Sequence, residues 1–201
     1  MDKNSLEYMF VKQVLGDKGV EIFKNTTFLC NPGKNSGSFD IGDGLIFLSS
    51  EIFSNPMSTD RGRELLIHEL FHQIQYSSDP KAFEKLFVEF NLNINVAKFG
   101  LNPTTEYIDH TGGMIIIPDY STKQENYTYQ YNLSEITELS DLNFLEAQAQ
   151  LVGDFAKYYY SERYSDGIPI WKKNDMKKMA QILKNSGYDT EAVQWVLENY
   201  Q

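Results

Sequence analysis

The sequence predicts an α+β fold, organised as one domain over residues 1–201. An apolar stripe with helical spacing, uninterrupted by Pro or Gly over residues 63–75, surrounds a His-Glu-x-x-His motif. Short apolar runs separated by Gly, Asn and Pro precede this helix, as is typical of strands in a small sheet. Longer helical patterns follow it, and one of them has a Glu in its first turn. We therefore expect a small N-terminal sheet packed on the motif helix and on a second, Glu-bearing helix, with a helical C-terminus.

Composition limits the partners that this chain can have. The 201 residues are 41% hydrophobic and carry a formal net charge of −10. This charge argues against sequence-independent binding to nucleic acid or to an anionic membrane, because both need clustered Lys and Arg. The single cysteine, Cys30, excludes an intrachain disulfide, and we expect it to be a small core residue rather than a nucleophile.

The chain shows no sign of insertion into a membrane or of a cleaved leader. No run approaches the ~20 apolar residues of a membrane span. The first residues lack the apolar stretch of a signal peptide. We expect a protein that is cytoplasmic as synthesised, and export, if it occurs, would use a system that needs no signal peptide.

The N-terminal part is predicted to begin with a helix and continue as a sheet. Residues 5–15 have helical apolar spacing, and Gly16 is expected to end that helix. Four later segments have strand patterns: residues 19–23, 26–30, 38–41 and 45–48. The last two flank Gly42-Asp43-Gly44 and are typical of a β-hairpin. Either hairpin strand could offer an open edge to an extended peptide.

The central helix is predicted over residues 63–75. Candidate N-caps lie just upstream at Ser58, Thr59 and Asp60, and residues 77–80 form a stop signal. The apolar stripe of this helix consists of Leu65, Leu66, Leu70, Phe71 and Ile74. A helix buried on one side and facing a cleft with the other is expected from this pattern.

The rest of the chain is predicted to be mainly helical. Helices are expected over residues 81–89, 142–161, 174–184 and 190–200. Asp141 is the expected N-cap of the second of these, and Gly187 fits the C′ position of the third. Residues 100–111 look like a loop. Strands are expected at residues 114–118 and where Tyr127, Tyr129 and Tyr131 alternate with polar residues.

The motif His68-Glu69-Leu70-Phe71-His72 predicts a metal site. On a helix, positions four apart lie on one face, so His68 and His72 can offer their imidazoles to a single ion. Glu69 is rotated by about 100° from His68. Its carboxylate is then beside the metal, where it can take a proton from a bound water instead of binding the ion. A coincidence on a core helix is disfavoured, because the chain has only three His.

A catalytic zinc usually has three protein ligands, so one more donor is needed. The remaining histidine, His110, is one candidate. Glu146 is favoured, because it lies at the start of a long predicted helix among small residues that allow close approach. Glu138 is the reserve candidate. Gln150 and Asp154 follow Glu146 by one and two turns, and either could accept the second N–H of a ligating histidine.

Two segments resemble one known family. His68–Gln75 is similar to the His-Glu-Leu-x-His-x-x-Gln segment of bacterial zincin-like metallopeptidase domains, which occur in extracellular contractile injection systems and beside Rhs or VgrG proteins of secretion systems. Residues 143–155 are similar to the Glu-bearing helix of the same group. Together with the strand-then-helix entry before the motif, the resemblance covers about residues 40–160.

The resemblance implies a gluzincin-like site, in which zinc is bound by His68, His72 and Glu146 and the catalytic base is Glu69. It also implies a protein or peptide substrate, and a secretion-system component or an inhibitor protein as a further partner. The chain departs from the thermolysin-like pattern, because Gln150 replaces the Asp expected four residues after the Glu ligand.

The expected activity is zinc-dependent hydrolysis of peptide bonds. The tetrahedral intermediate needs an electrophilic partner besides the metal, and His110, Tyr129 and Tyr131 are candidates ahead of Tyr76. The alternative is a zincin-like binding or structural module, or a delivered effector of a bacterial secretion or contractile injection system, with little or no proteolysis. Hydrolysis of a non-peptide amide or ester is a third hypothesis.

Overall fold

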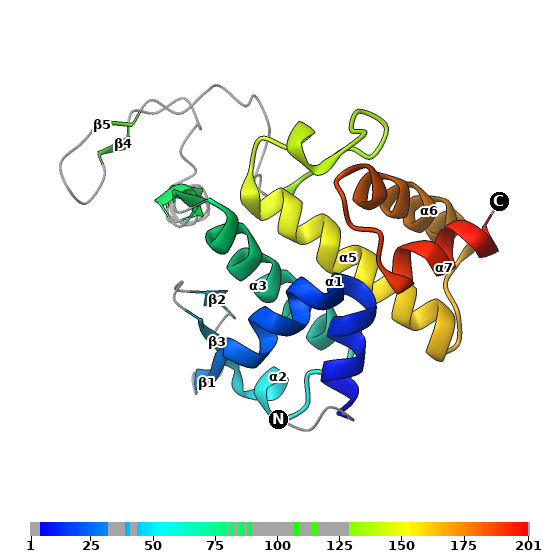
Figure 1. The fold of residues 1–201 in the computed structure, drawn as a ribbon, viewed down its shortest axis with the longest axis horizontal. Helices are drawn as coiled ribbons and strands as arrows, with labels where there is room; N and C mark the ends of the chain where they lie inside the picture. Colours follow the sequence, from blue (N-terminus) through cyan, green and yellow to red (C-terminus); the bar gives the residue numbers. More distant parts are fainter. Residues whose placement is uncertain are drawn as a thin grey trace.

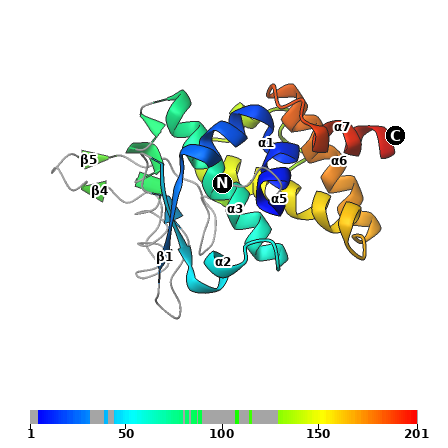
Figure 2. The same cartoon turned by 60° about the horizontal axis from the view of Figure 1, so that its bottom comes forward.

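The computed structural model describes residues 5–31, 39–40, 44–79, 81–82, 84–86, 88–89, 107–108, 114–115 and 129–200. This part of the chain is mostly helical with a small sheet, which agrees with the predicted α+β class. Helices α3 (Asp60–Ser78) and α5 (Leu145–Tyr164) lie side by side through the middle of the molecule (Figure 1). The sheet lies on the α3 side of this pair, and helices α6 (Ile170–Asn185) and α7 (Glu191–Asn199) lie on the α5 side (Figure 2).

The sheet has the strand order β1-β3-β2. Strands β1 (Thr27–Asn31) and β3 (Leu45–Ser49) are parallel, with Thr27 opposite Leu45, whereas β2 (Phe39–Asp40) is antiparallel to β3. The predicted hairpin and the strand predicted at residues 26–30 are therefore confirmed. Because β3 has a neighbour on both sides, β2 is the hairpin strand that lies at the sheet edge. A short helix, α2 (Ser50–Ser54), follows β3.

Gly44 joins the sheet to the central helix. Its φ of 72° favours glycine, and a Cβ there would lie 2.9 Å from the carbonyl oxygen of Asn25. The N–H of Gly44 donates to Oε1 of Gln73 on α3, at 3.0 Å. The carbonyl of Gly44 accepts from the N–H of Thr27 at the start of β1. The sheet is thereby held against the helix that carries the motif.

Two N-terminal predictions are wrong. Helix α1 (Leu6–Asn25) is kinked at Gly16 but continues beyond it, so residues 19–23 are helical and not a strand. The reason is that Val20 and Phe23 are buried at helical spacing, which outweighs the local strand pattern. The second error is Cys30, which is exposed near the end of the edge strand β1 and is not a core residue.

Helix α3 begins three residues before its predicted range but at a predicted N-cap, whereas α5 begins without its predicted N-cap. Thr59 is the N-cap of α3, and its hydroxyl accepts from the N–H of Gly62 at 3.0 Å. Helix α5 begins at Leu145, later than predicted, and Asp141 is not its N-cap. The Asp141 carboxylate instead accepts from the backbone of Thr137 and from that of the next residue, around the 3-10 turn η2 (Leu139–Asp141). That local capping competes with extension of α5 toward the N-terminus.

The two predicted C-terminal helices are confirmed, with α6 starting four residues earlier than expected. They contact α5, and α7 also contacts α1. Gly187, with a φ of 88°, lies just after α6, which suits the predicted C′ position. Their buried side chains are Met176, Met179, Ala180, Ile182, Leu183, Ala192, Val193 and Val196. Among the described helices, none is both long and apolar enough to cross a membrane.

The middle of the chain is described only in part. Its described residues between 82 and 89 are helical, as predicted. Strand β5 (Met114–Ile115) confirms the start of the strand expected at residues 114–118, and it pairs with β4 (Tyr107–Ile108) inside the stretch expected to be a loop. Residues 129–131 are not a strand, because Tyr129 lies in a 3-10 turn and the next two residues have no regular structure. Tyr127 lies outside the described residues.

Close packing of α3 against α5 depends on Gly153. A Cβ at this position would lie 3.0 Å from the carbonyl oxygen of Glu64 and 3.4 Å from Cβ of His68. Gly153→Leu should force the helices apart, lowering the free energy of unfolding by ~1–3 kcal/mol as other overpacked cores do. Urea unfolding would measure this loss, with Gly153→Ala expected to cost less. Equal stability of Gly153→Leu and wild type would contradict close contact at this point.

Candidate metal site

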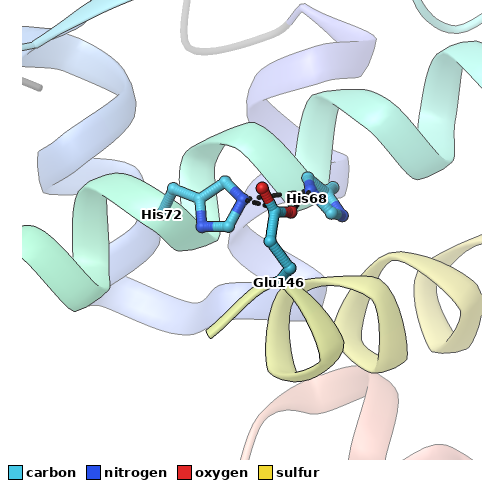
Figure 3. Close-up of side chains that lie close together, drawn as sticks. All are labelled: His68, His72 and Glu146. Atoms are coloured by element: carbon cyan, nitrogen blue, oxygen red, sulfur yellow. Dashed lines mark hydrogen bonds and ion pairs between the residues drawn. The ribbon is translucent and has the colours of Figure 1, made fainter. Parts of the chain in front are cut away.

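Three side chains from α3 and α5 converge on one point (Figure 3). Oε2 of Glu146 lies 3.2 Å from Nε2 of His68 and 3.2 Å from Nε2 of His72. The two Nε2 atoms are 3.0 Å apart. All three residues are buried, with exposed fractions of 4%, 4% and 6% in chain order. The structure thus brings together the two motif histidines and the Glu that the sequence favoured as their partner.

The triangle of donor atoms has the dimensions of a metal site. Neighbouring ligands of a tetrahedral zinc, bound at about 2.0–2.2 Å, are about 3.3 Å apart. The distances of 3.0–3.2 Å between the donor atoms are within a few tenths of an ångström of that value. Two imidazole nitrogens and one carboxylate oxygen are also a donor set that zinc commonly has in catalytic sites. The residues present therefore fit a divalent metal, and within the described part of the chain they are the group that does.

In the metal-free protein, burial and mutual interactions shift the pKa of all three residues. Burial is the largest single influence on His72 and would lower its pKa, but the charge and hydrogen bond of Glu146, together with the charge of Glu69 and the hydrogen bond to Gln75, outweigh it and raise that pKa to about 10. Burial lowers the pKa of His68. Burial would raise the pKa of Glu146, yet the charge of His72 and the hydrogen bonds with both imidazoles hold it well below its usual range. The metal-free cluster is thus a His72 cation paired with a Glu146 carboxylate, next to a neutral His68.

Glu69 lies beside this cluster and is not one of the three converging donors. Its exposed fraction is 3%, and it has interactions within the structure. Its negative charge contributes to the raised pKa of both His72 and Tyr129, so the carboxylate is close to both groups. The structure therefore places the predicted general base next to the candidate ligands.

Tyr129 is the described tyrosine that faces the site. Its ring centroid lies 6.0 Å from that of His68. Burial raises its pKa, and the charges of Glu146 and Glu69 raise it further, so the hydroxyl remains protonated at neutral pH. Tyr131, the other described candidate, instead donates its hydroxyl to Asp154 at 2.7 Å. His110 lies outside the described residues.

The prediction of which residue supports the ligating histidines is wrong. Nδ1 of His72 lies 2.8 Å from Oε1 of Gln75, one turn along the same helix. Gln150 instead donates to Glu64 at 3.0 Å, and Asp154 pairs with Lys157 and Tyr131. The i, i+3 spacing of His72 and Gln75 was a signal in the sequence that could have identified this contact.

The register of the two helices explains why Gln150 and Asp154 do not reach the imidazoles. Contacts run in opposite directions along α3 and α5: Gln75 bonds to the backbone of Leu145, and Asp60 bonds to Ser161. Successive turns of α5 after Glu146 therefore face earlier turns of α3, where Glu64 also pairs with Lys157 at 2.9 Å. Each turn of α5 advances by about 5.4 Å, so Gln150, one turn after Glu146, already lies beyond the histidines.

Glu89 fixes the start of α5 from another part of the chain. Its carboxylate accepts from the N–H of Leu145 at 3.0 Å and from the N–H of Glu146 at 2.9 Å. The N-cap Phe144 has no side chain that can do this. Burial raises the pKa of Glu89 to about 7. No local sequence pattern could have linked Glu89 to this helix terminus.

The reserve ligand Glu138 is not at the site. It is exposed, it caps the turn η2, and it accepts from the hydroxyl of Ser140 at 2.5 Å. The candidate metal ligands in the described part of the chain are therefore His68, His72 and Glu146.

Comparisons of this chain with protein-family models, with curated proteins and with solved structures found no match.

Metal binding should release a proton, because a ligating imidazole must be neutral and the raised pKa of His72 keeps it protonated in the metal-free protein. At pH 6, below the range in which a zinc-bound water ionises, we expect about one proton released per Zn²⁺. Affinity should then rise ~10-fold per pH unit. Calorimetry in buffers of different ionisation enthalpy measures the proton count. Binding without proton release would contradict the charge distribution described above.

Proposed function

We propose that this protein is a zinc-dependent metallopeptidase of the zincin class, with His68, His72 and Glu146 as the metal ligands and Glu69 as the general base. The observation that carries the proposal is the triangle of donor atoms with sides of 3.0–3.2 Å, formed across two helices. Its resemblance to bacterial zincin-like domains, at the motif and at the Glu-bearing helix, supports the same assignment.

The donor set favours zinc over Mg²⁺ and Ca²⁺. Mg²⁺ and Ca²⁺ prefer oxygen ligands, whereas two of the three donors here are imidazole nitrogens. Three protein ligands are the usual number in a catalytic zinc site, and four are usual in a structural one. When bound, zinc would act as a Lewis acid and lower the pKa of a water from 15.7 toward ~7.

Glu69 is suited to move a proton within this site. Its carboxylate is on the same helix as the two histidines but is not part of the donor triangle, so in this proposal it accepts a proton and does not bind the metal. It can then return the proton to the leaving amine. Burial keeps this carboxylate away from bulk water, where its charge would be screened.

Tyr129 is suited to donate a hydrogen bond to the developing negative charge. Its raised pKa keeps the phenol protonated at the pH of turnover. A neutral donor fixed in advance next to the reacting carbonyl stabilises an oxyanion without reorganisation. Tyr131 does not have this role in the proposal, because its hydroxyl is bonded to Asp154. The hydroxyl of Tyr129 is instead bonded to Glu146, the proposed ligand at the metal site.

Strand β2 is the part of the sheet suited to align an extended substrate. It lies at the edge of the sheet and contacts α3. A peptide added to a sheet edge is held by its main chain, so this mode accepts many sequences. The proposal therefore specifies peptide-bond hydrolysis and does not specify side-chain preference.

A zincin-like module without activity is the alternative, and no feature of the site favours it. Metal binding alone requires the three donors and gives no role to a buried carboxylate at position 69. The intact His-Glu-x-x-His order, which puts a carboxylate directly after the first ligand, therefore supports catalysis over a purely structural metal.

Glu69→Gln is the direct test of the proposal. The amide cannot accept the proton, so peptide hydrolysis should fall by ~10²–10⁴-fold while one Zn²⁺ per chain is retained. Glu146→Ala is the companion variant and should lose zinc together with activity. Turnover would be followed on unfolded protein substrates, and metal content by elemental analysis. Native turnover by Glu69→Gln would remove the general-base assignment, and full zinc retention by Glu146→Ala would remove the ligand set.

A further inference from the structure

We propose that Gln75 is a positioning residue that presents Nε2 of His72 to the metal and links this ligand to Glu146. The inference rests on the metal site proposed above. It adds to that site two side-chain amides that hydrogen-bond to each other and to backbone carbonyl groups. The second amide is Gln148, on the first turns of α5.

The contacts form a continuous chain from the imidazole to the backbone. Nδ1 of His72 lies 2.8 Å from Oε1 of Gln75. The amide nitrogen of Gln75 donates to the carbonyl oxygen of Leu145 at 3.1 Å and to Oε1 of Gln148 at 3.0 Å. The amide nitrogen of Gln148 donates to the carbonyl oxygen of Leu142 at 3.2 Å.

The backbone determines the direction of every bond in this chain. A carbonyl oxygen can only accept, so Gln148 must turn its NH₂ group toward Leu142 and its oxygen toward Gln75. Gln75 must likewise turn its NH₂ group toward two acceptors, Leu145 and Gln148. Its oxygen is then left facing Nδ1 of His72, which must donate. A neutral His72 therefore carries its proton on Nδ1, and Nε2 has the free lone pair that a metal needs.

Gln75 also restrains the peptide group that precedes the third ligand. The carbonyl of Leu145 accepts from Gln75, and the N–H of the same peptide group, which belongs to Glu146, donates to Glu89. The peptide plane is held at both ends by side chains from outside α5. Gln75 therefore contacts His72 directly and Glu146 through one peptide group, so a single residue restrains two of the three ligands.

The two histidines are held unequally. Nδ1 of His68 is buried and has no hydrogen-bond partner among the described residues, in contrast to Nδ1 of His72. An outer hydrogen bond of this kind typically contributes 10–100-fold to metal affinity. Among the described residues, Gln75 is therefore the one that gives Nδ1 of a ligating histidine such a hydrogen bond.

The test compares zinc affinity among four proteins: wild type, Gln75→Met, Gln75→Glu and Gln73→Met. Methionine keeps the length of the side chain, which limits entry of water from the adjacent surface hollow of about 400 Å³, lined in part by Gln75 and Gln148. Glutamate keeps the acceptor for His72 and removes the donors. Gln73 is the matched control, because it is a buried glutamine of the same helix whose oxygen accepts from the N–H of Gly44, the residue just before β3.

Competition with a chelator would measure affinity, and the visible absorption of the Co²⁺-loaded protein would report ligand geometry. Gln75→Met should bind Zn²⁺ 10–100-fold more weakly and alter the Co²⁺ spectrum. Gln75→Glu should recover most of the affinity, and Gln73→Met should keep the affinity and spectrum of wild type.

Two results would overturn the positioning role while leaving the proposed function intact. The first is that Gln75→Met binds Zn²⁺ with wild-type affinity. The second is that Gln75→Met and Gln75→Glu lose equal zinc affinity, in proportion to the folding stability that each loses without metal. The second result would mean that Gln75 only braces α3 against α5. Failure of the wild-type protein to bind Zn²⁺ at all would instead remove the proposed function, and this inference with it.

Discussion

One carboxylate oxygen, that of Glu146, must lie about 3 Å from two imidazole nitrogens, away from water, for this site to form. Burying Glu146 with His68 and His72 is costly unless their charges are paired or a metal binds. The 3.2 Å contacts of Oε2 with both Nε2 atoms meet this requirement in the metal-free protein. The same contacts leave the donors at the spacing that a divalent ion needs.

Three features of the fold serve this contact. Gly153 allows the backbones of α3 and α5 to approach closely next to His68. Glu89 supplies the capping groups that the sequence before α5 lacks, and so fixes where that helix begins. Gln75 connects the second histidine to the same helix end. Because the ligands come from both helices, any change in their spacing or rotation would separate the donors before the core is lost.

The part of the site that could be predicted from the sequence is the part set by short spacing. The separation of His68 and His72 is fixed by helix geometry, and Glu146 was recognisable from its position at a helix start among small residues. Gln75 was within reach of the same reasoning, as a neighbour one turn after His72. Gln150 and Asp154 were preferred wrongly, because their role depends on how α5 is aligned against α3, which no local pattern reveals.

Contacts between residues far apart in the sequence could not be predicted from local residue patterns. Glu89 lies 56 and 57 residues before the N–H groups that it caps. Residues 19–23 formed a helix because Val20 and Phe23 face the core together with the rest of α1, so tertiary packing overrode a short strand pattern. The hairpin was predicted correctly because a Gly-Asp-Gly turn between two apolar runs is a local signal.

Anomalous X-ray diffraction at the zinc absorption edge, from crystals of the protein loaded with one equivalent of Zn²⁺, would locate the metal. We expect one strong peak about 2.0–2.2 Å from Nε2 of His68, from Nε2 of His72 and from a carboxylate oxygen of Glu146. A peak at another place, or none while the three side chains keep the arrangement described here, would rule out the shared metal site.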